Sequence, residues 1–253
     1  YPSKEVIVLL GNYKLIVLGN NMRRNNTVYL LAVMSLMIAI MILFGFTPIG
    51  TIATPAFTIT LMGIPVAVIA CVFGPIMGLV AGSVWGIISI IQAFSGMDAT
   101  GVLLLSAPDI PAANKYIGLI FMCLIARMLT GFLAGFFFDL VKHFDKRGFF
   151  ASFAGSLSTA FFNTLFFMSF FVIFFFNTET VQNTYVNAFI EAGWAAQNPF
   201  IFVIAVIGFN FIVELLVNAI VGSFVSFGIT QGARKIGLSN PLPRFFAKKE
   251  QNA

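Results

Sequence analysis

Charged residues are scarce in this chain of 253 residues, since Asp, Glu, Lys and Arg together make up 9% of it and 59% is hydrophobic. So few polar side chains cannot cover the surface of a soluble globule of this length. Histidine occurs only at position 143, and cysteine only at positions 71 and 123. The composition therefore predicts an integral membrane protein with no separate soluble domain.

The same scarcity excludes several kinds of chemistry. The sequence has no His-Glu-x-x-His helix, no cluster of cysteine and histidine for a metal, and no G-x-x-x-x-G-K-[ST] phosphate loop. His143 lies among basic residues at the end of an apolar run and is interpreted as a solvated loop residue. An intramembrane hydrolase is therefore not expected, and neither is a metal or another cofactor. Cys71 and Cys123 fall near opposite ends of different predicted spans, so we expect no disulfide between them.

Apolar segments long enough to cross a bilayer core of about 30 Å occur six times. They are predicted at residues 28–46, 56–73, 76–94, 117–141, 149–176 and 199–229, with a tight Gly74-Pro75 corner between the second and the third. We therefore expect an all-α bundle of six transmembrane helices over residues 27–232. A leader (1–26) would precede it and a basic tail (233–253) would follow. Met22 is an alternative start, which would make the residues before it non-native.

The distribution of basic residues predicts the orientation of this bundle. Twelve of the fourteen fall on one side of a six-span arrangement: Lys4, Lys14, Arg23, Arg24, Lys142, Lys146, Arg147, Arg234, Lys235, Arg244, Lys248 and Lys249. They form no stripe interleaved with aromatic residues, so they indicate topology and not a nucleic-acid partner. Both termini are expected in the cytoplasm. The long connections 47–55, 95–116 and 177–198 would then lie outside and cover a pocket.

Arg127 is the clearest single candidate for a functional residue. A guanidinium well inside the fourth predicted span is costly unless it has a partner, and ionisable residues within a membrane are functional candidates by default. Its planar donor fork suits a substrate carboxylate. The alternative is an internal role, either an ion pair with Glu214 or hydrogen bonds to helix carbonyls.

Other polar residues recur at helical spacing inside the spans. Each could line a pocket or could serve helix packing and interhelical hydrogen bonding, and both interpretations stay open. Asn218, one turn after Glu214, is interpreted mainly as an interhelical contact. The predicted substrate-binding set is Arg127, Gln92, Asn163, Asn210, Glu214 and Trp85.

Several segments together resemble the substrate-binding S-components of energy-coupling factor (ECF) vitamin transporters, over about residues 28–230. These segments are TPIG at 47–50, ATPAFTITLMGIPV at 53–66, FGPIMGLVAGSVWGIISIIQ at 73–92, and Ile-Ala-Arg at 125–127 followed by Gly131 and Gly135. Within the family, NAFIEAGWAAQNPF at 187–200 and GFNFIVELLVN at 208–218 are most similar to the pantothenate-specific branch.

The resemblance implies a transport subunit in a bacterial cell membrane that captures a vitamin from outside. It implies partners as well, namely a transmembrane scaffold subunit (the T component) and two cytoplasmic ATPases, to which ATP hydrolysis would belong. The alternatives are another substrate of the same family, such as pyridoxine, hydroxymethylpyrimidine, folate or riboflavin, and a stand-alone channel or facilitator.

The resemblance also assigns roles outside the pocket. It places Thr47, Pro48, Ile49, Gly50 and Trp194 in the outer cover. It places a scaffold-docking face on the first span. Relatives carry an Ala-x-x-x-Ala pattern there, whereas this chain has Ala32 followed by Leu36, and its nearest match is Ser35 with Ala39. Internal helix packing is the alternative role for Ala32, Ser35 and Ala39.

Overall fold

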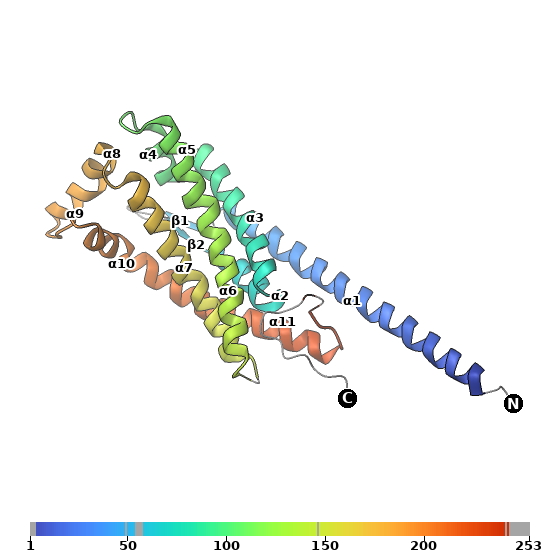
Figure 1. Cartoon of the computed structure of the whole chain (residues 1–253). Coiled ribbons are helices and arrows are strands. Elements are labelled where there is room, and N and C mark those ends of the chain that lie inside the picture. The colour runs from blue at the N-terminus through green and yellow to red at the C-terminus, as the bar shows by residue number, and fades with distance from the viewer. Residues whose placement is uncertain (1–3, 49, 54–57, 146, 241, 243–253) are drawn as a thin grey trace.

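Helices form most of the computed structural model, which describes residues 4–48, 50–53, 58–145, 147–240 and 242 (Figure 1). For residues 4–21, 23, 51–53, 58, 59 and 206–210 it describes the backbone only. The elements are, in order, α1 (Lys4–Phe46), β1 (Thr51–Ala53), β2 (Thr58–Thr60), α2 (Gly63–Phe73), α3 (Pro75–Phe94), α4 (Ala99–Ser106), α5 (Ala112–Ile120), η1 (Phe121–Ile125), α6 (Ala126–Lys142), α7 (Phe149–Phe175), α8 (Glu179–Val181), η2 (Gln182–Val186), α9 (Asn187–Glu191), α10 (Pro199–Val217), η3 (Asn218–Gly222) and α11 (Ser223–Lys235).

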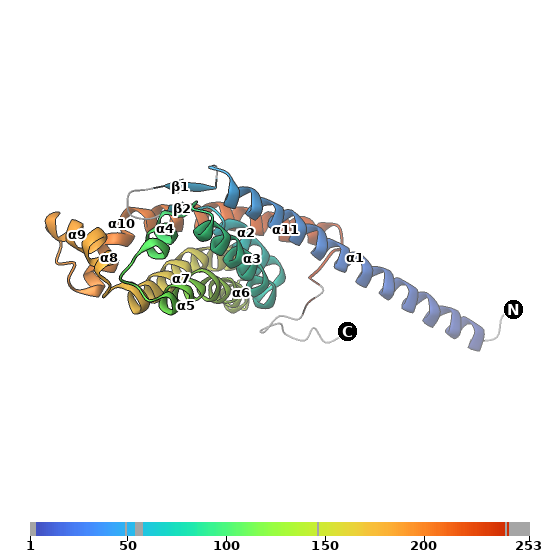
Figure 2. The same ribbon diagram turned by 90° about the horizontal axis from the view of Figure 1, so that it is seen from above.

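Long apolar helices confirm the prediction of a helical, multi-pass membrane protein. Among the described residues, five helical segments are long and apolar enough to cross a membrane: Arg24–Phe46, Pro75–Phe94, Ala112–Lys142, Phe149–Phe175 and Phe211–Lys235. The last runs through the π-helical segment η3, which joins α10 to α11 without a break. The predicted leader is likewise helical and continues into the first span as α1, whose first half extends away from the bundle (Figures 1 and 2).

The second predicted span, 56–73, is wrong in its first part. Residues Thr58–Thr60 form strand β2, which pairs antiparallel with β1, and helix α2 begins only at Gly63. Thr-Ile-Thr is β-branched throughout, which favours an extended backbone over a helix. At eleven residues, α2 is about 16 Å long, too short to cross the bilayer core alone.

Helix α2 is instead the central core element of the bundle. Ten of its eleven residues are buried, and Val66, Ala67, Val68, Ile69, Ala70 and Cys71 are fully inaccessible. It packs against α1, α3, α6, α7 and α11. A helix that is apolar on every side lies either in a protein core or in lipid, and the contacts of α2 show that it lies among the other helices of the bundle.

The Gly74-Pro75 corner is present as predicted. Helix α2 ends at Phe73, Gly74 has a φ of +95°, and Pro75 is the first residue of α3. Glycine adopts positive φ without steric penalty, and proline suits the first helical position because it needs no N–H partner there.

Helices α3 and α6 approach each other through glycines. A Cβ at Gly82 would lie 2.1 Å from the carbonyl oxygen of Arg127, and one at Gly78 would lie 2.1 Å from that of Gly131. Such distances require residues without side chains, and small residues are what let membrane helices pack backbone to backbone. The contact at Gly82 therefore sets the position of Arg127 along α3.

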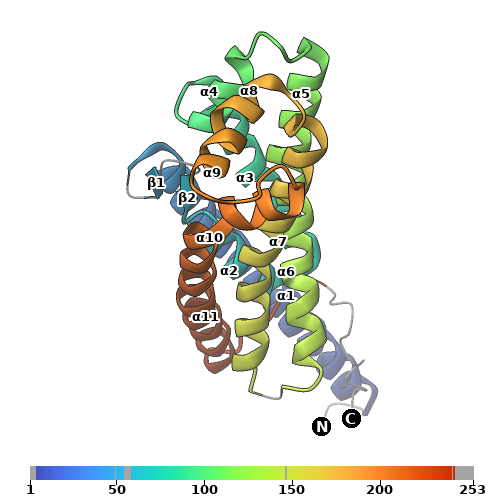
Figure 3. The same cartoon turned by 90° about the vertical axis from the view of Figure 1, so that its left-hand side faces the viewer.

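The long connections 95–116 and 177–198 lie at one end of the bundle and contain short helices (Figure 3). They share one hydrophobic cluster: Leu104, Ala107 and Ile110 from the former pack with Val181, Val186 and Ala196 from the latter and with Phe171, Phe175 and Phe202 beneath them. The start of α1, the end of α11 and the α6–α7 turn lie at the opposite end (Figures 1 and 3).

Cys71 and Cys123 are both buried and are not joined by a disulfide in the described structure, as predicted.

Candidate functional site

Arg127 lies halfway along the continuous helix formed by α5, η1 and α6, and only 8% of its surface is exposed. The guanidinium Nη1 donates a hydrogen bond to the carbonyl oxygen of Met122 in η1. Insertions of π-helix into α-helices occur frequently at functional sites. The hydrogen bond to a helix carbonyl, which was one of the internal roles expected for Arg127, is therefore present and helps to hold its side chain in place.

Two aromatic rings flank the guanidinium. Its Cζ atom lies 5.2 Å from the ring centre of Trp85 on α3 and 5.3 Å from that of Phe167 on α7. Both distances fall within the range of cation–π attraction, which is strongest where water is excluded. Trp85 is 1% exposed, so the pair is formed inside the bundle. Thus three helices position one cation.

Several polar atoms around this point are buried and have no hydrogen-bond partner. They include Nε of Arg127, Nε1 of Trp85 and Oδ1 of Asn163. Asn163 lies one turn before Phe167 on α7 and so on the same helix face. Buried polar groups are nearly always hydrogen-bonded, and unpartnered ones in a native fold call for a ligand or water. Two donors and one acceptor are available here.

Glu214 approaches the same region from α10. Its side chain is 8% exposed, its Oε1 accepts a hydrogen bond of 2.8 Å from the backbone N–H of Thr60, and it interacts electrostatically with Arg127. In the part of the chain that the structure describes, however, the two residues form no ion pair. The alternative of an Arg127–Glu214 ion pair is therefore not found there, and Glu214 instead joins α10 to strand β2.

Gln92 and Asn210 are placed differently from the residues around Arg127. Gln92 lies two turns beyond Trp85 on α3, and its Nε2 donates a 2.6 Å hydrogen bond to the carbonyl of Gly45 at the end of α1. It therefore fastens α1 to α3, beside the predicted cover. Asn210 lies on α10 one turn before Glu214, and its side chain is outside the described residues.

The first predicted cover segment forms the turn that leaves α1. The Thr47 hydroxyl donates to the Leu43 carbonyl, Pro48 is exposed, and Gly50 packs directly on the backbone of Phe44. Ile49 lies outside the described residues. Trp194 follows α9 and is 46% exposed.

Polar contacts tie the other two connections together. The Asp109 carboxylate accepts hydrogen bonds from the hydroxyl and the backbone N–H of Thr180, the latter at 3.0 Å. The Tyr185 side chain hydrogen-bonds to Thr100. Together with the hydrophobic cluster they share, these contacts make the 95–116 and 177–198 connections one continuous cap.

The small residues predicted for docking lie on the outside of α1. Ala32, Ser35 and Ala39 are exposed, whereas Met34, Met37 and Met41 face the core. Bulky apolar residues, including Leu31, Leu36, Ile42 and Leu43, are exposed beside them. Internal packing is therefore not what these three side chains do in this structure.

Two contributors to the site were not predicted. Phe167 is one of 32 phenylalanines and was given no role, although its position four residues after Asn163 already placed the two on one face. Thr60 contributes a backbone N–H, which no side-chain pattern in a sequence reveals. Thr60 belongs to the strand that was predicted as helix.

The arrangement can bind an anion. A buried guanidinium between aromatic rings, with an unpartnered indole N–H and amide oxygen nearby, matches a carboxylate attached to a polar body. Among the described residues there is no group of three or more His, Cys, Asp or Glu side chains that could hold a metal ion.

Comparison with known proteins supplies the family. None of the curated proteins is a significant match to this chain. The family model of the ECF transporter, substrate-specific component, matches residues 30–226, which include every helix that surrounds Arg127. The chain therefore belongs to the substrate-specific components of ECF transporters.

Proposed function

We propose that this chain binds a vitamin or vitamin precursor with a carboxylate at Arg127, and that pantothenate is the first candidate. The observation that carries the proposal is the buried guanidinium between Trp85 and Phe167, whose Nε has no partner. A bidentate bond from this fork to a carboxylate would use Nε together with an Nη. The ligand would thereby neutralise a charge that is costly inside a membrane.

The other unpartnered atoms favour a ligand that carries hydroxyl and amide groups as well. Nε1 of Trp85 can only donate, and Oδ1 of Asn163 can only accept. Pantothenate has a carboxylate, an amide and hydroxyls, so it offers both kinds of partner. The ring faces of Trp85 and Phe167 would exclude water from the charged pair and so strengthen it.

We further propose six crossings with both termini in the cytoplasm, in line with the positive-inside distribution of Lys and Arg. Helix α2 and the β1–β2 hairpin together would make the second crossing, inside the protein, where a non-helical backbone is tolerated at membrane depth. The cap formed by the 95–116 and 177–198 connections would then face outward and open to admit the ligand.

Tryptophan fluorescence of the purified subunit tests the binding site directly. The chain has two tryptophans, so a Trp194→Phe variant leaves Trp85 as the only reporter. Titration with pantothenate or folate, which carry a carboxylate, should change its emission at micromolar or lower concentration, whereas pyridoxine and riboflavin, which carry none, should not. If no vitamin changes the emission and calorimetry detects no binding, the proposal is wrong.

We also propose that the chain works in complex with a transmembrane scaffold and two ATPases, as membership of the family implies. Affinity purification of the tagged chain from its native membrane should bring down a membrane subunit and nucleotide-binding subunits. Substrate uptake without them would favour a stand-alone facilitator.

A further inference from the structure

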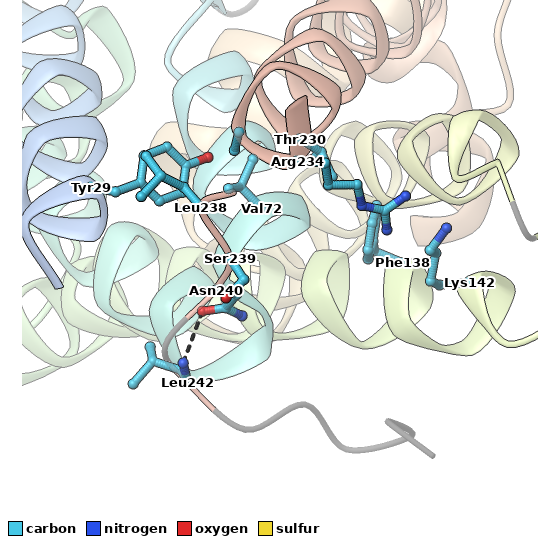
Figure 4. A pocket seen from close by; sticks show the side chains of 11 residues that line it. Tyr29, Val72, Phe138, Lys142, Thr230, Arg234, Leu238, Ser239, Asn240 and Leu242 are labelled. Carbon is cyan, nitrogen blue, oxygen red and sulfur yellow. Dashed lines mark hydrogen bonds between the residues drawn. The ribbon is translucent and has the colours of Figure 1, made fainter. Parts of the chain in front are cut away.

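A second concave site lies at the end of the bundle opposite the cap. It is a cavity of about 370 Å³ between the middle of α1, the end of α2, the last turns of α6 and α11, and the segment that follows α11. Figure 4 shows Lys142 and Arg234 beside Phe138 on one side of it, and Tyr29 with Leu238 on the other. Cavities of this size hold small organic ligands. None of the residues that form the Arg127 site lines it.

The segment after α11 is fixed as a wall of this cavity by hydrogen bonds to distant parts of the chain. Asn26 on α1 donates to the hydroxyl of Ser239 (2.9 Å) and accepts from its backbone N–H (3.0 Å). Asn240 donates to the carbonyl of Phe73, the last residue of α2 (3.1 Å). Its own side-chain oxygen accepts from the N–H of Leu242, the bond drawn in Figure 4. The cavity is therefore built by long-range contacts and is not a gap between loose ends.

The charge at the cavity is positive. Arg234 and Lys142 line it, and none of the described lining residues is acidic. The Lys142 ammonium is held in place by the backbone carbonyl of Asp145 (3.0 Å). The carboxylate of Asp145 accepts N–H groups of Arg147 and Ala151 and so caps the start of α7. Within the described part of the chain, Arg234 forms no ion pair.

A hydrogen-bonding group is also available opposite the two cations. The hydroxyl of Tyr29 is buried and has no partner, while its ring packs on Phe73 at 5.5 Å between centroids. A buried hydroxyl without a partner costs free energy that a ligand oxygen would recover. Apolar side chains, namely Val72, Phe138 and Leu238, form the rest of the wall.

We propose that this cavity binds a phosphate ester, with the phosphate between Arg234 and Lys142, the Tyr29 hydroxyl donating to an ester oxygen, and an apolar part of the ligand against Phe138 and Leu238. Arginine and lysine are the side chains that recognise phosphate. The combination of two cations with apolar walls fits an anionic phospholipid headgroup at the membrane edge. A soluble phosphate compound offers the same chemistry. This site is independent of the substrate bound at Arg127.

Native mass spectrometry of the purified full chain in detergent tests the proposal. The probes are phosphatidylglycerol, phosphatidylcholine and, in a separate thermal-shift titration, inorganic phosphate. We expect phosphatidylglycerol to bind, and its affinity to fall about tenfold in Arg234→Gln through loss of a charge-assisted hydrogen bond. Phosphatidylcholine should bind less well, because its choline cation would meet two cations. Lys235→Gln is the matched control, since Lys235 neighbours Arg234 on the same helix and does not line the cavity.

A second variant distinguishes a specific loss of binding from misfolding of the chain. Tyr29→Phe keeps the ring that packs on Phe73 and removes only the hydroxyl, so phosphatidylglycerol affinity should fall severalfold with an unchanged melting temperature. Binding of inorganic phosphate that depends on Arg234, without binding of phosphatidylglycerol, would support the site and identify a soluble ligand. Equal effects of Arg234→Gln and Lys235→Gln, or no binding of either probe, would overturn the proposal.

Discussion

The guanidinium of Arg127 lies 5.2 Å from the ring centre of Trp85, inside the bundle and away from water. The two residues come from different helices, and the glycine contact that brings them together is at Gly82, whose Cα lies against the Arg127 carbonyl. A cation placed so firmly and left with an unpartnered Nε is suited to receive an anion.

Replacing Arg127 tests whether this residue binds the substrate or only supports the fold. In Arg127→Ala we expect affinity for a carboxylate vitamin to fall by about 10- to 150-fold, the equivalent of about 1.5–3 kcal/mol for hydrogen bonds to a charged group. Arg127→Lys keeps the charge without the planar fork and should recover only part of the affinity. Calorimetry on variants whose melting temperatures are unchanged measures this. Undiminished binding in Arg127→Ala would make the residue structural.

The hydrogen bond between Glu214 and Thr60 should stabilise the fold of the hairpin region. Glu214→Ala leaves the Thr60 N–H without its acceptor, so we expect a loss of about 1–3 kcal/mol in the free energy of unfolding. Glu214→Gln retains a side-chain oxygen in the same place and should lose less. Thermal unfolding in detergent compares the two. Equal losses would mean that the carboxylate charge matters and the hydrogen bond does not.

Gly82 should tolerate no side chain. Since a Cβ there would lie 2.1 Å from the Arg127 carbonyl, Gly82→Ala must push α3 away from α6, at a cost of about 1–3 kcal/mol. Ligand affinity should fall too, because Trp85 would move relative to Arg127. Gly228→Ala is the control: nothing lies within 4 Å of its Cβ position, and alanine favours a helix over glycine. It should leave the melting temperature unchanged or higher.

Local patterns in the sequence predicted those parts of the fold that depend on local physics. The Gly74-Pro75 corner follows from the backbone preferences of glycine and proline. The helical nature of the long apolar runs follows from their length. That Arg127 is a cation inside a membrane span could also be predicted, because few charged residues fall within the apolar runs.

What could not be predicted depends on contacts between distant segments. Hydropathy placed residues 56–73 in a single span because a short strand followed closely by an apolar buried helix has the average hydropathy and the length of a membrane helix. Phe167 shares a helix face with Asn163, but that spacing alone does not show that its ring is the second one on Arg127. The choice of Thr60 as the partner of Glu214 likewise arises only when α10 and β2 come together.

The cap should loosen in acid through Asp109. Hydrogen bonds from the Thr180 side chain and backbone lower the pKa of Asp109 below its ordinary value of 3.8. A carboxyl group with a lowered folded pKa stabilises the folded form fully above the ordinary value, and that stabilisation disappears as the pH falls through the lowered one. We therefore expect faster hydrogen exchange in residues 177–198 only below about pH 4.

Asp109→Asn is the control for this effect. Asparagine keeps one acceptor oxygen but does not titrate, so exchange in the cap should be faster than in the wild type at neutral pH and should change less on acidification. The difference between the two proteins isolates Asp109 from Asp98, Glu179 and Glu191, which lie in the same connections. Identical pH profiles in both would rule out the Asp109–Thr180 contact as the acid-sensitive element.

The exposed small face of α1 should mediate contact with the scaffold subunit. Ser35→Leu and Ala39→Leu add bulk where the structure shows no internal contact to disturb, so folding and vitamin binding should be retained. Close helix approach would be blocked, and co-purification of the scaffold and ATPases should fall. Ser169→Leu is the matched control, since Ser169 is likewise an exposed serine on a membrane span, α7, away from this face. If all three variants retain the partners equally well, the scaffold docks elsewhere; if all three lose them, added bulk acts through the membrane and not through α1.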